Sequence, residues 1–179
     1  VIVDEVTAEV FDEIATKKIE VVKSISNEIP MREICRLMGN PNQDGRQLLN
    51  VTNSFLKIFL PINASRITAE EINAASRTFI DYFQKCVKSS SDRNRDDLIS
   101  QLTFGPLQNG DISLAQLVGL LRGLFTAGYE TTAAGISACF HAFASYQEQF
   151  QLLREDTSLI ANAAEEILRW ETPVQAILR

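Results

Sequence analysis

The sequence lacks a basic patch. Its 17 lysines and arginines are scattered among 23 acidic residues, and the formal net charge is −6. Domains that bind nucleic acid usually carry clustered Lys and Arg side chains on one face. A nucleic-acid partner is therefore not expected. The acidic balance itself is common among cytoplasmic proteins and indicates little more.

The sequence also lacks paired cysteines. Its three cysteines, Cys35, Cys86 and Cys139, lie far apart and form no C-x-x-C pattern. This spacing predicts neither a disulfide framework nor a zinc site. We expect all three to behave as small buried apolar residues in a reducing compartment.

Two kinds of N-terminal or membrane signal are missing as well. The first residues, VIVDEVTAEV, carry acids where a signal peptide carries bases. The longest apolar runs are interrupted by Arg122 and Glu130, so no membrane span is expected. These features predict a cytoplasmic protein. The missing initiator methionine favours an internal segment of a longer chain.

Helical patterns fill most of the sequence, with apolar residues recurring every three or four positions. A capping box at Ser113–Gln116 predicts the start of a helix of roughly 30 residues, well above the usual length. The only candidate strand is residues 173–179. The pattern predicts a mainly α chain that forms a single partial domain over residues 1–179. The other expected helices cover residues 6–24, 30–37, 44–59, 68–87, 96–102, 146–154 and 158–170.

The centre of the expected long helix is unusual. Residues 120–140, LLRGLFTAGYETTAAGISACF, are almost wholly apolar but include Glu130 and Thr131. A carboxylate here must be paired, solvated or neutralised. Thr131 can bond to the carbonyl of Ala127 and distort the helix, while Ala127 and Gly128 leave a flat patch for a large planar ligand. An acid and an alcohol beside that patch suit proton delivery. The alternative is a core helix that another helix crosses closely.

A second pattern lies near the C-terminus. In AAEEILRWETPV, Glu166 and Arg169 are three residues apart. Residues at this spacing share one face of a helix and can form an ion pair. Alone, such a pair is a weak signal, because most are exposed and contribute little.

Together, and in this order, the two patterns resemble the cytochrome P450 family. Residues 127–132, AGYETT, resemble its (A/G)-G-x-(D/E)-T-(T/S) oxygen-binding groove, and residues 166–169 resemble the E-x-x-R of its K helix. Residues 30–41, PMREICRLMGNP, are similar to the bacterial pattern P-x-x-V-I-x-x-L-L-G-x-P. Residues 173–179 resemble the segment after the K helix. The resemblance implies the helical core of a soluble bacterial-type P450 fold, roughly its D to K helices, incomplete at both ends.

The resemblance implies the central part of a heme-thiolate monooxygenase. Such an enzyme inserts one oxygen atom from O2 into a small organic substrate, with heme b as cofactor. A ferredoxin-type protein would supply the electrons. The binding of nucleic acid or membrane is not expected.

The resemblance also implies a role for each matching residue. Glu130 and Thr131 would be the catalytic pair, with Thr131 hydrogen-bonding dioxygen or its water and Glu130 feeding protons. Ala127 and Gly128 would line the groove over the heme, and Arg179 would meet a heme propionate. The buried structural residues that lock the K helix in place would be Glu166 and Arg169.

The cysteine loop of the family, F-x-x-G-x-x-x-C-x-G, does not occur in residues 1–179. None of the three cysteines is expected to be the iron ligand, so the segment alone is predicted to be inactive. His141 is either a replacement heme ligand or, as we favour, an ordinary histidine. Tyr129 is expected to pack or to join a water network, and Trp170 is expected to be a core residue.

Two other interpretations compete with the monooxygenase. One is a truncated, heme-free P450-like scaffold or activator that binds a partner enzyme. The other is an unrelated helical bundle. The AGYETT and E-x-x-R patterns favour the monooxygenase, whereas a chain that truly ended at residue 179 would favour the scaffold.

Overall fold

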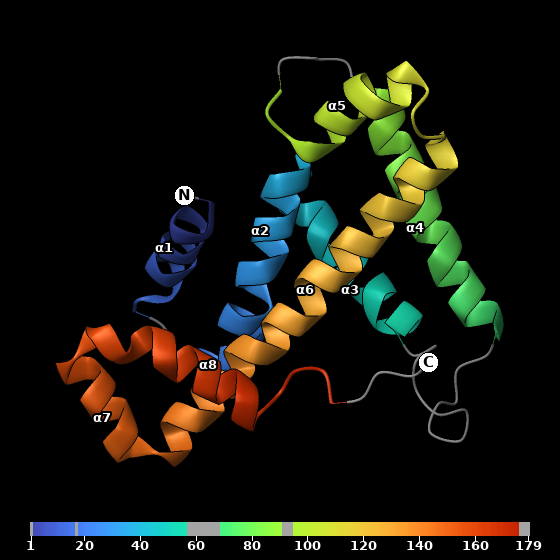
Figure 1. The fold of residues 1–179 in the computed structure, drawn as a ribbon. Helices are drawn as coiled ribbons and strands as arrows, with labels where there is room; N and C mark the ends of the chain where they lie inside the picture. The colour runs from blue at the N-terminus through green and yellow to red at the C-terminus, as the bar shows by residue number, and fades with distance from the viewer. Residues whose placement is uncertain (1, 17, 57–68, 91–94, 176–179) are drawn as a thin grey trace. The chain divides into compact units, whose positions relative to one another are not determined.

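The computed structural model describes residues 2–16, 18–56, 69–90 and 95–175. These residues are mainly helical (Figure 1), and no strand occurs among them. The mainly α prediction is therefore confirmed. The described part of the predicted strand, residues 173–175, is irregular, and its remaining residues lie outside the described chain.

The chain forms two compact units. The terminal unit comprises residues 3–30 and the stretch that begins at Gly128, and the middle unit comprises residues 31–127. Helices α2 (Glu28–Met38) and α6 (Leu114–Ser145) contribute residues to both units. The expectation of a single domain over residues 1–179 stays a prediction.

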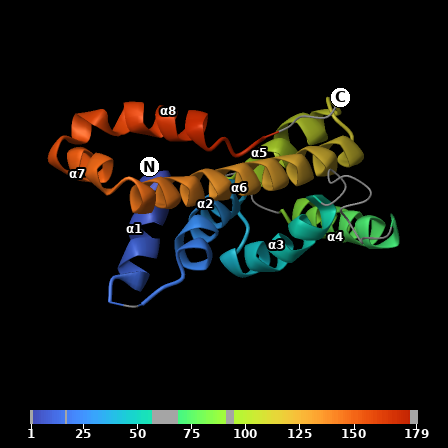
Figure 2. The same ribbon diagram turned by 90° about the horizontal axis from the view of Figure 1, so that it is seen from below.

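In the terminal unit, α7 (Gln147–Glu155) and α8 (Ile160–Trp170) fold back along the second half of α6 (Figure 2). The core of this contact joins Ala138 and Ala142 of α6 to Ile167 of α8. Small side chains on α6 allow the close approach. The other elements of the unit are α1 (Ile2–Ile14), a π-helical turn (Val22–Ser26), α7 (Gln147–Glu155), a 3-10 turn (Thr157–Leu159) and α8 (Ile160–Trp170).

The prediction of one continuous helix over residues 6–24 is wrong, because α1 ends at Ile14 and the next helical segment begins at Val22. Glu20 provides the physical reason. Its carboxylate accepts hydrogen bonds from the backbone N–H groups of Val22, at 3.1 Å, and Lys23, at 2.8 Å. These bonds satisfy N–H groups that a helix start leaves unpaired, so Glu20 caps a new helical segment.

The middle unit is built around three fully buried phenylalanines, Phe79, Phe83 and Phe125. Their ring centroids lie 6.1 to 6.3 Å apart, within the range of favourable aromatic pairs. They join α4 (Ala69–Ser89) to the first half of α6. The remaining elements are α3 (Asn42–Leu56), α4 (Ala69–Ser89), α5 (Leu98–Leu102) and a π-helical turn (Thr103–Leu107).

The end of α2 depends on a glycine. Gly39 has φ +85°, and a Cβ atom there would lie 2.5 Å from Cγ of Asp97. Asp97 is buried, accepts a hydrogen bond from the N–H of Ser100 at 2.8 Å, and pairs with Arg95 at 2.7 Å. Arg95 also donates to the Gly39 carbonyl at 3.2 Å. Through these contacts of Arg95 and Asp97, the turn after α2 is fixed against the start of α5.

Gly39→Ala should consequently destabilise the chain by about 2 kcal/mol or more, combining left-handed backbone strain with the clash against Asp97. The matched control is Gly110→Ala, because Gly110 has φ +80° but nothing within 4 Å of an added Cβ. It should cost only the backbone strain, about 1 kcal/mol. Urea unfolding of both variants measures the difference. Equal losses would contradict the proposed clash.

No helix in the described ranges has both the length and the apolar character needed to cross a membrane.

Candidate functional site

Helix α6 begins at the predicted capping box. The Ser113 N–H donates to Oε1 of Gln116 at 2.9 Å, and Oγ of Ser113 accepts from the Gln116 N–H at 3.3 Å. The helix then continues without interruption to Ser145. The local distortion predicted at Thr131 does not break it.

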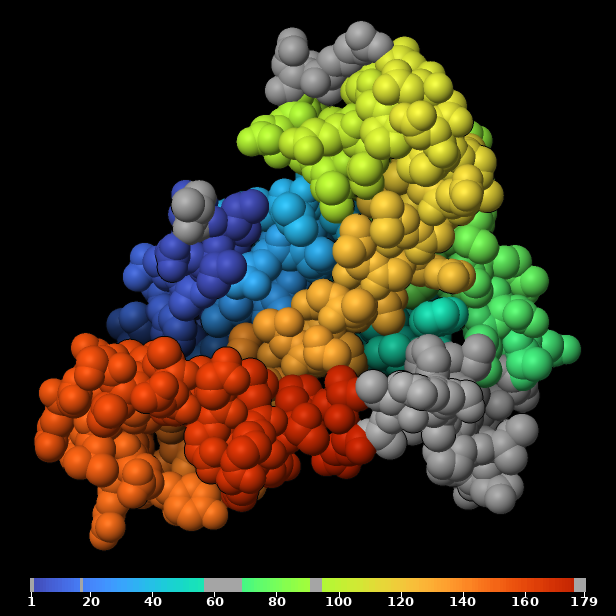
Figure 3. Space-filling model, in the orientation of Figure 1, coloured from blue at the N-terminus to red at the C-terminus, as the bar shows by residue number. Residues whose placement is uncertain are grey.

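The groove motif forms an open face in the middle of α6. Atoms of α6 are seen at the surface in Figure 3. Ala127, Gly128 and Thr131 are all exposed, as the i, i+1, i+4 spacing of a helix face allows. The same face continues toward the N-terminus with Leu120 and Leu124, which are 45% and 37% exposed. The result is a strip of small and apolar side chains at the surface.

The apolar helix accommodates the acid Glu130 by placing it at the surface. Its side chain is exposed, so the carboxylate is solvated. The neighbouring Tyr129 is buried, as expected for packing. Burial, followed by the charge of Glu130, raises the pKa of Tyr129, so its phenol stays protonated at neutral pH. Glu130 is the one carboxylate of the motif, and it lies at the surface.

Glu166 and Arg169 form the predicted ion pair on α8. Nε and Nη2 of Arg169 each donate to a carboxylate oxygen of Glu166 at 2.7 Å, which makes the pair bidentate. The expectation that these residues are buried is wrong, because their side chains are 61% and 70% exposed. Ile167 supplies the buried face of α8, whereas the side chains of Glu166 and Arg169 are largely in solvent.

Helix α8, which carries the second motif, contacts α6 about one helical turn beyond the groove motif. Gly135, one helical turn after Thr131, has Leu168 and Pro173 within 3.7 Å of its would-be Cβ atom. Leu168 lies between the two members of the ion pair in sequence. The helix that carries E-x-x-R therefore covers α6 where the open face ends. Arg179, the expected propionate contact, lies outside the described residues.

Removing Arg169 should change the titration of Glu166. Hydrogen bonds from Arg169 hold the pKa of Glu166 below its usual value. The stabilisation from the pair is therefore present above the usual glutamate pKa of about 4.3 and is lost as the pH falls through the lowered value. In Arg169→Met, the pKa of Glu166 should return upward, as measured by NMR. Arg154→Met on α7 is the control, and an unchanged Glu166 pKa in Arg169→Met would contradict the pairing.

The three cysteines do not provide a thiolate. All are free, and Cys35 is fully buried. Burial raises the pKa of Cys35 to about 11, and it also raises the pKa values of Cys86 and Cys139. Each thiol therefore stays protonated at neutral pH. The expectation of a small buried residue is confirmed for Cys35, whereas Cys86 and Cys139 are only partly buried.

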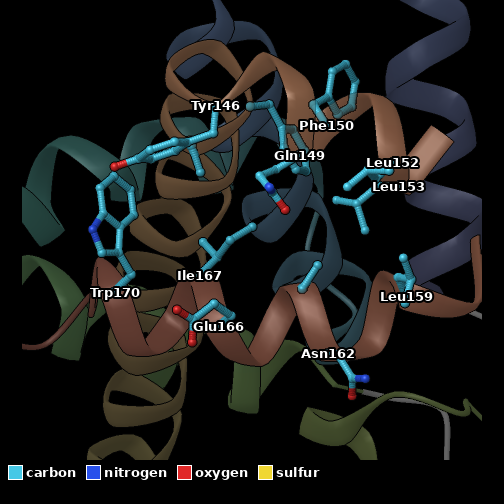
Figure 4. A pocket seen from close by; sticks show the side chains of 13 residues that line it. Tyr146, Gln149, Phe150, Leu152, Leu153, Leu159, Asn162, Glu166, Ile167 and Trp170 are labelled. Carbon is cyan, nitrogen blue, oxygen red and sulfur yellow. The ribbon is translucent and has the colours of Figure 1, made fainter. Parts of the chain in front are cut away.

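A cleft of about 510 Å³ between the end of α6, α7 and α8 was missed by the sequence reasoning (Figure 4). Tyr146 and Trp170 form one end of it and Leu159 lies toward the other, with Gln149 between them. Its signal in the sequence is the set of apolar residues on the facing sides of two short amphipathic helices. Trp170 is 40% exposed, so the expectation that it is a core residue is wrong.

Comparisons with known proteins agree on one family. The family model described as Cytochrome P450 matches residues 23–171, more than half of the chain. Cytochrome P450 CYP107DY1 of Priestia megaterium is 30% identical over 173 residues, which cover 96% of this chain and 41% of that protein. Vitamin D(3) 25-hydroxylase of Pseudonocardia autotrophica is 32% identical over 163 residues, covering 90% and 38%.

A solved structure gives the same result for the fold. The crystal structure of P450BioI in complex with hexadec-9Z-enoic acid ligated acyl carrier protein matches with a TM-score of 0.84 at 27% identity. The match covers 97% of this chain and 44% of that one. The chain thus spans about two fifths of the length of the curated relatives that it matches.

Proposed function

This chain belongs to the cytochrome P450 family, and on that basis we propose that it is the central part of a heme-thiolate monooxygenase. The complete enzyme would insert one oxygen atom from O2 into a small organic substrate. The observation that carries the proposal is the open face of α6, where Ala127, Gly128 and Thr131 are exposed beside an exposed Glu130.

The residues of this face fit a heme ring but not its iron. Ala127 and Gly128 have too little bulk to obstruct a flat macrocycle, and Leu120 and Leu124 offer exposed apolar side chains on the same side of α6. None of the three cysteines belongs to this face of α6, so the thiolate would come from outside these 179 residues. When bound, the heme supplies the redox chemistry that activates dioxygen.

Two residues of the chain would manage protons at the groove. Glu130 is solvent-exposed and can take up protons from water. Thr131, the next residue, places a hydroxyl on the open face. A positioned acid and alcohol of this kind typically accelerate a proton-dependent step by 10²–10⁴-fold. Glu166 and Arg169 would hold α8 and perform no chemistry.

The finer assignments follow the family. We propose heme b as the cofactor, with Arg179 near a propionate, and a ferredoxin-type protein as electron donor. The relatives include a vitamin D(3) hydroxylase and a P450 in complex with a fatty-acyl carrier protein. These names favour an apolar organic substrate. A cytoplasmic location is part of the same proposal.

A heme-free scaffold is the second candidate, because none of the three cysteines belongs to the open face of α6. In that case the open face of α6 would be covered by a partner protein. The two candidates differ in whether a change on this face affects heme binding.

Gly128→Leu should therefore weaken heme retention by the complete protein about tenfold, because an added side chain would obstruct the ring. The ratio of heme absorbance to protein absorbance after gel filtration measures it. Gly119→Leu is the matched control, since Gly119 is on the same helix with open space around it. Equal heme content in the wild type and both variants would contradict a heme groove at Gly128.

A further inference from the structure

Arg122 is a cation within the apolar first half of α6. It belongs to the middle unit and is half-buried. Its Nη1 atom donates a hydrogen bond to Oγ of Ser76 on α4 at 3.1 Å. The guanidinium also lies over the ring of Phe55 on α3, 5.2 Å from the ring centroid. A guanidinium carries five N–H donors, so these contacts orient the group and leave most of its donors available.

No carboxylate neutralises this charge within the part of the chain that the structure describes, because Arg122 forms no ion pair there. The sequence that joins α3 to α4, residues 57–68, contains no acidic residue either. A charge that is withdrawn from water is normally paired. The guanidinium is therefore suited to an anion from outside these helices. The alternative is a purely structural tie between α6, α3 and α4.

Thr126 is a second polar group on the same side of α6, one helical turn after Arg122. It is 9% exposed, and its Oγ1 atom has no hydrogen-bond partner among the described residues. A threonine in a helix can bond to the carbonyl four residues earlier, but Thr126 does not. Because an unpaired buried hydroxyl is unfavourable, a polar ligand at this position would satisfy it.

The exposed side of α6 leaves room for such a ligand. Gly123 lies three residues before Thr126 and four before Ala127, so it shares a side of the helix with each. It is exposed, and an added Cβ atom would meet nothing within 4 Å. Ala127, where the groove motif begins, lies about 7.5 Å along the helix axis from Arg122. One molecule can therefore reach from the guanidinium to the groove motif.

We propose that Arg122 and Thr126 bind the carboxylate of the substrate, so that the enzyme acts on an apolar organic acid. This inference rests on the proposed monooxygenase function and adds the substrate class to it. The guanidinium, oriented by Ser76 and Phe55, gives charge-assisted hydrogen bonds to the carboxylate. The hydroxyl of Thr126 donates to the same group. The apolar remainder of the substrate extends along the exposed side of α6 toward Ala127.

Decanoate and 1-decanol are suitable probes, because they share an apolar chain and differ in the end group. In calorimetry with the complete protein, the wild type should bind decanoate about tenfold more tightly than decanol. Arg122→Met should lower the affinity for decanoate about tenfold and leave that for decanol nearly unchanged. Calorimetry needs no heme signal, so a failure of the acid site is distinguishable from a failure of the proposed function.

Arg77→Met is the matched control, because it removes the same charge from an exposed position next to Ser76. It should leave both affinities unchanged. If Arg122→Met does not fold, Arg122→Gln, which can still donate to Ser76, replaces it. Equal losses for decanoate and decanol would show that Arg122 is only a structural tie. A wild type that does not prefer decanoate, or a preference that survives the loss of the Arg122 charge, would also overturn the proposal.

Discussion

Thr131→Ala is expected to separate electron consumption from product formation in the complete heme protein. The variant should bind heme normally, because Thr131 contributes no bulk that the ring needs. It should continue to oxidise the reductant but form product about 10²-fold more slowly, since a positioned proton donor has been removed. The measurement is the amount of product formed per reductant consumed.

The neighbouring residue offers a matched control for this experiment. Thr132 is also exposed but lies outside the proposed pair, so Thr132→Ala should keep the wild-type product yield. Thr131→Ser, which restores a hydroxyl, should recover much of it. An unchanged product yield in Thr131→Ala would remove Thr131 from the proposed role.

Phe79→Ala should be the most damaging substitution in the middle unit. Phe79 is fully buried and contacts the rings of Phe55, Phe83 and Phe125. Truncation would remove these contacts and leave a cavity, at a cost of about 3–5 kcal/mol in the free energy of unfolding. Urea or thermal unfolding measures this loss.

An exposed phenylalanine provides the comparison. Phe11 on α1 is exposed, so Phe11→Ala should change stability by no more than about 0.5 kcal/mol. Similar losses for the two variants would mean that the phenylalanine cluster does not form the core of the middle unit.

Local signals in the sequence predicted the long helix well. The capping box at Ser113 placed its start within one residue of the observed Leu114. The side chains of Ser113 and Gln116 satisfy N–H groups of neighbouring residues, so this signal does not depend on tertiary contacts. The resemblance to the P450 family and its helical core is likewise confirmed by the family model and the solved structure. The roles of Glu130 and Thr131 stay predictions.

Properties that depend on tertiary contacts were not predictable in this way. The spacing of Glu166 and Arg169 predicted their pairing, but burial depends on what packs over α8, and the spacing does not specify it. The break before Val22 was missed because the apolar period continues through it, while the cap comes from Glu20. The cleft of Figure 4 depends on how α7 and α8 face each other.

The central claim is that this chain supplies the groove of a heme-thiolate enzyme whose iron ligand lies elsewhere. The most direct test is the absorption spectrum of the complete protein after reduction and addition of carbon monoxide, compared with that of the 179-residue chain. We predict the strongly red-shifted Soret band of thiolate-bound heme for the complete protein and its absence for the chain alone. A complete protein without a heme band, or with an unshifted one, would contradict the claim.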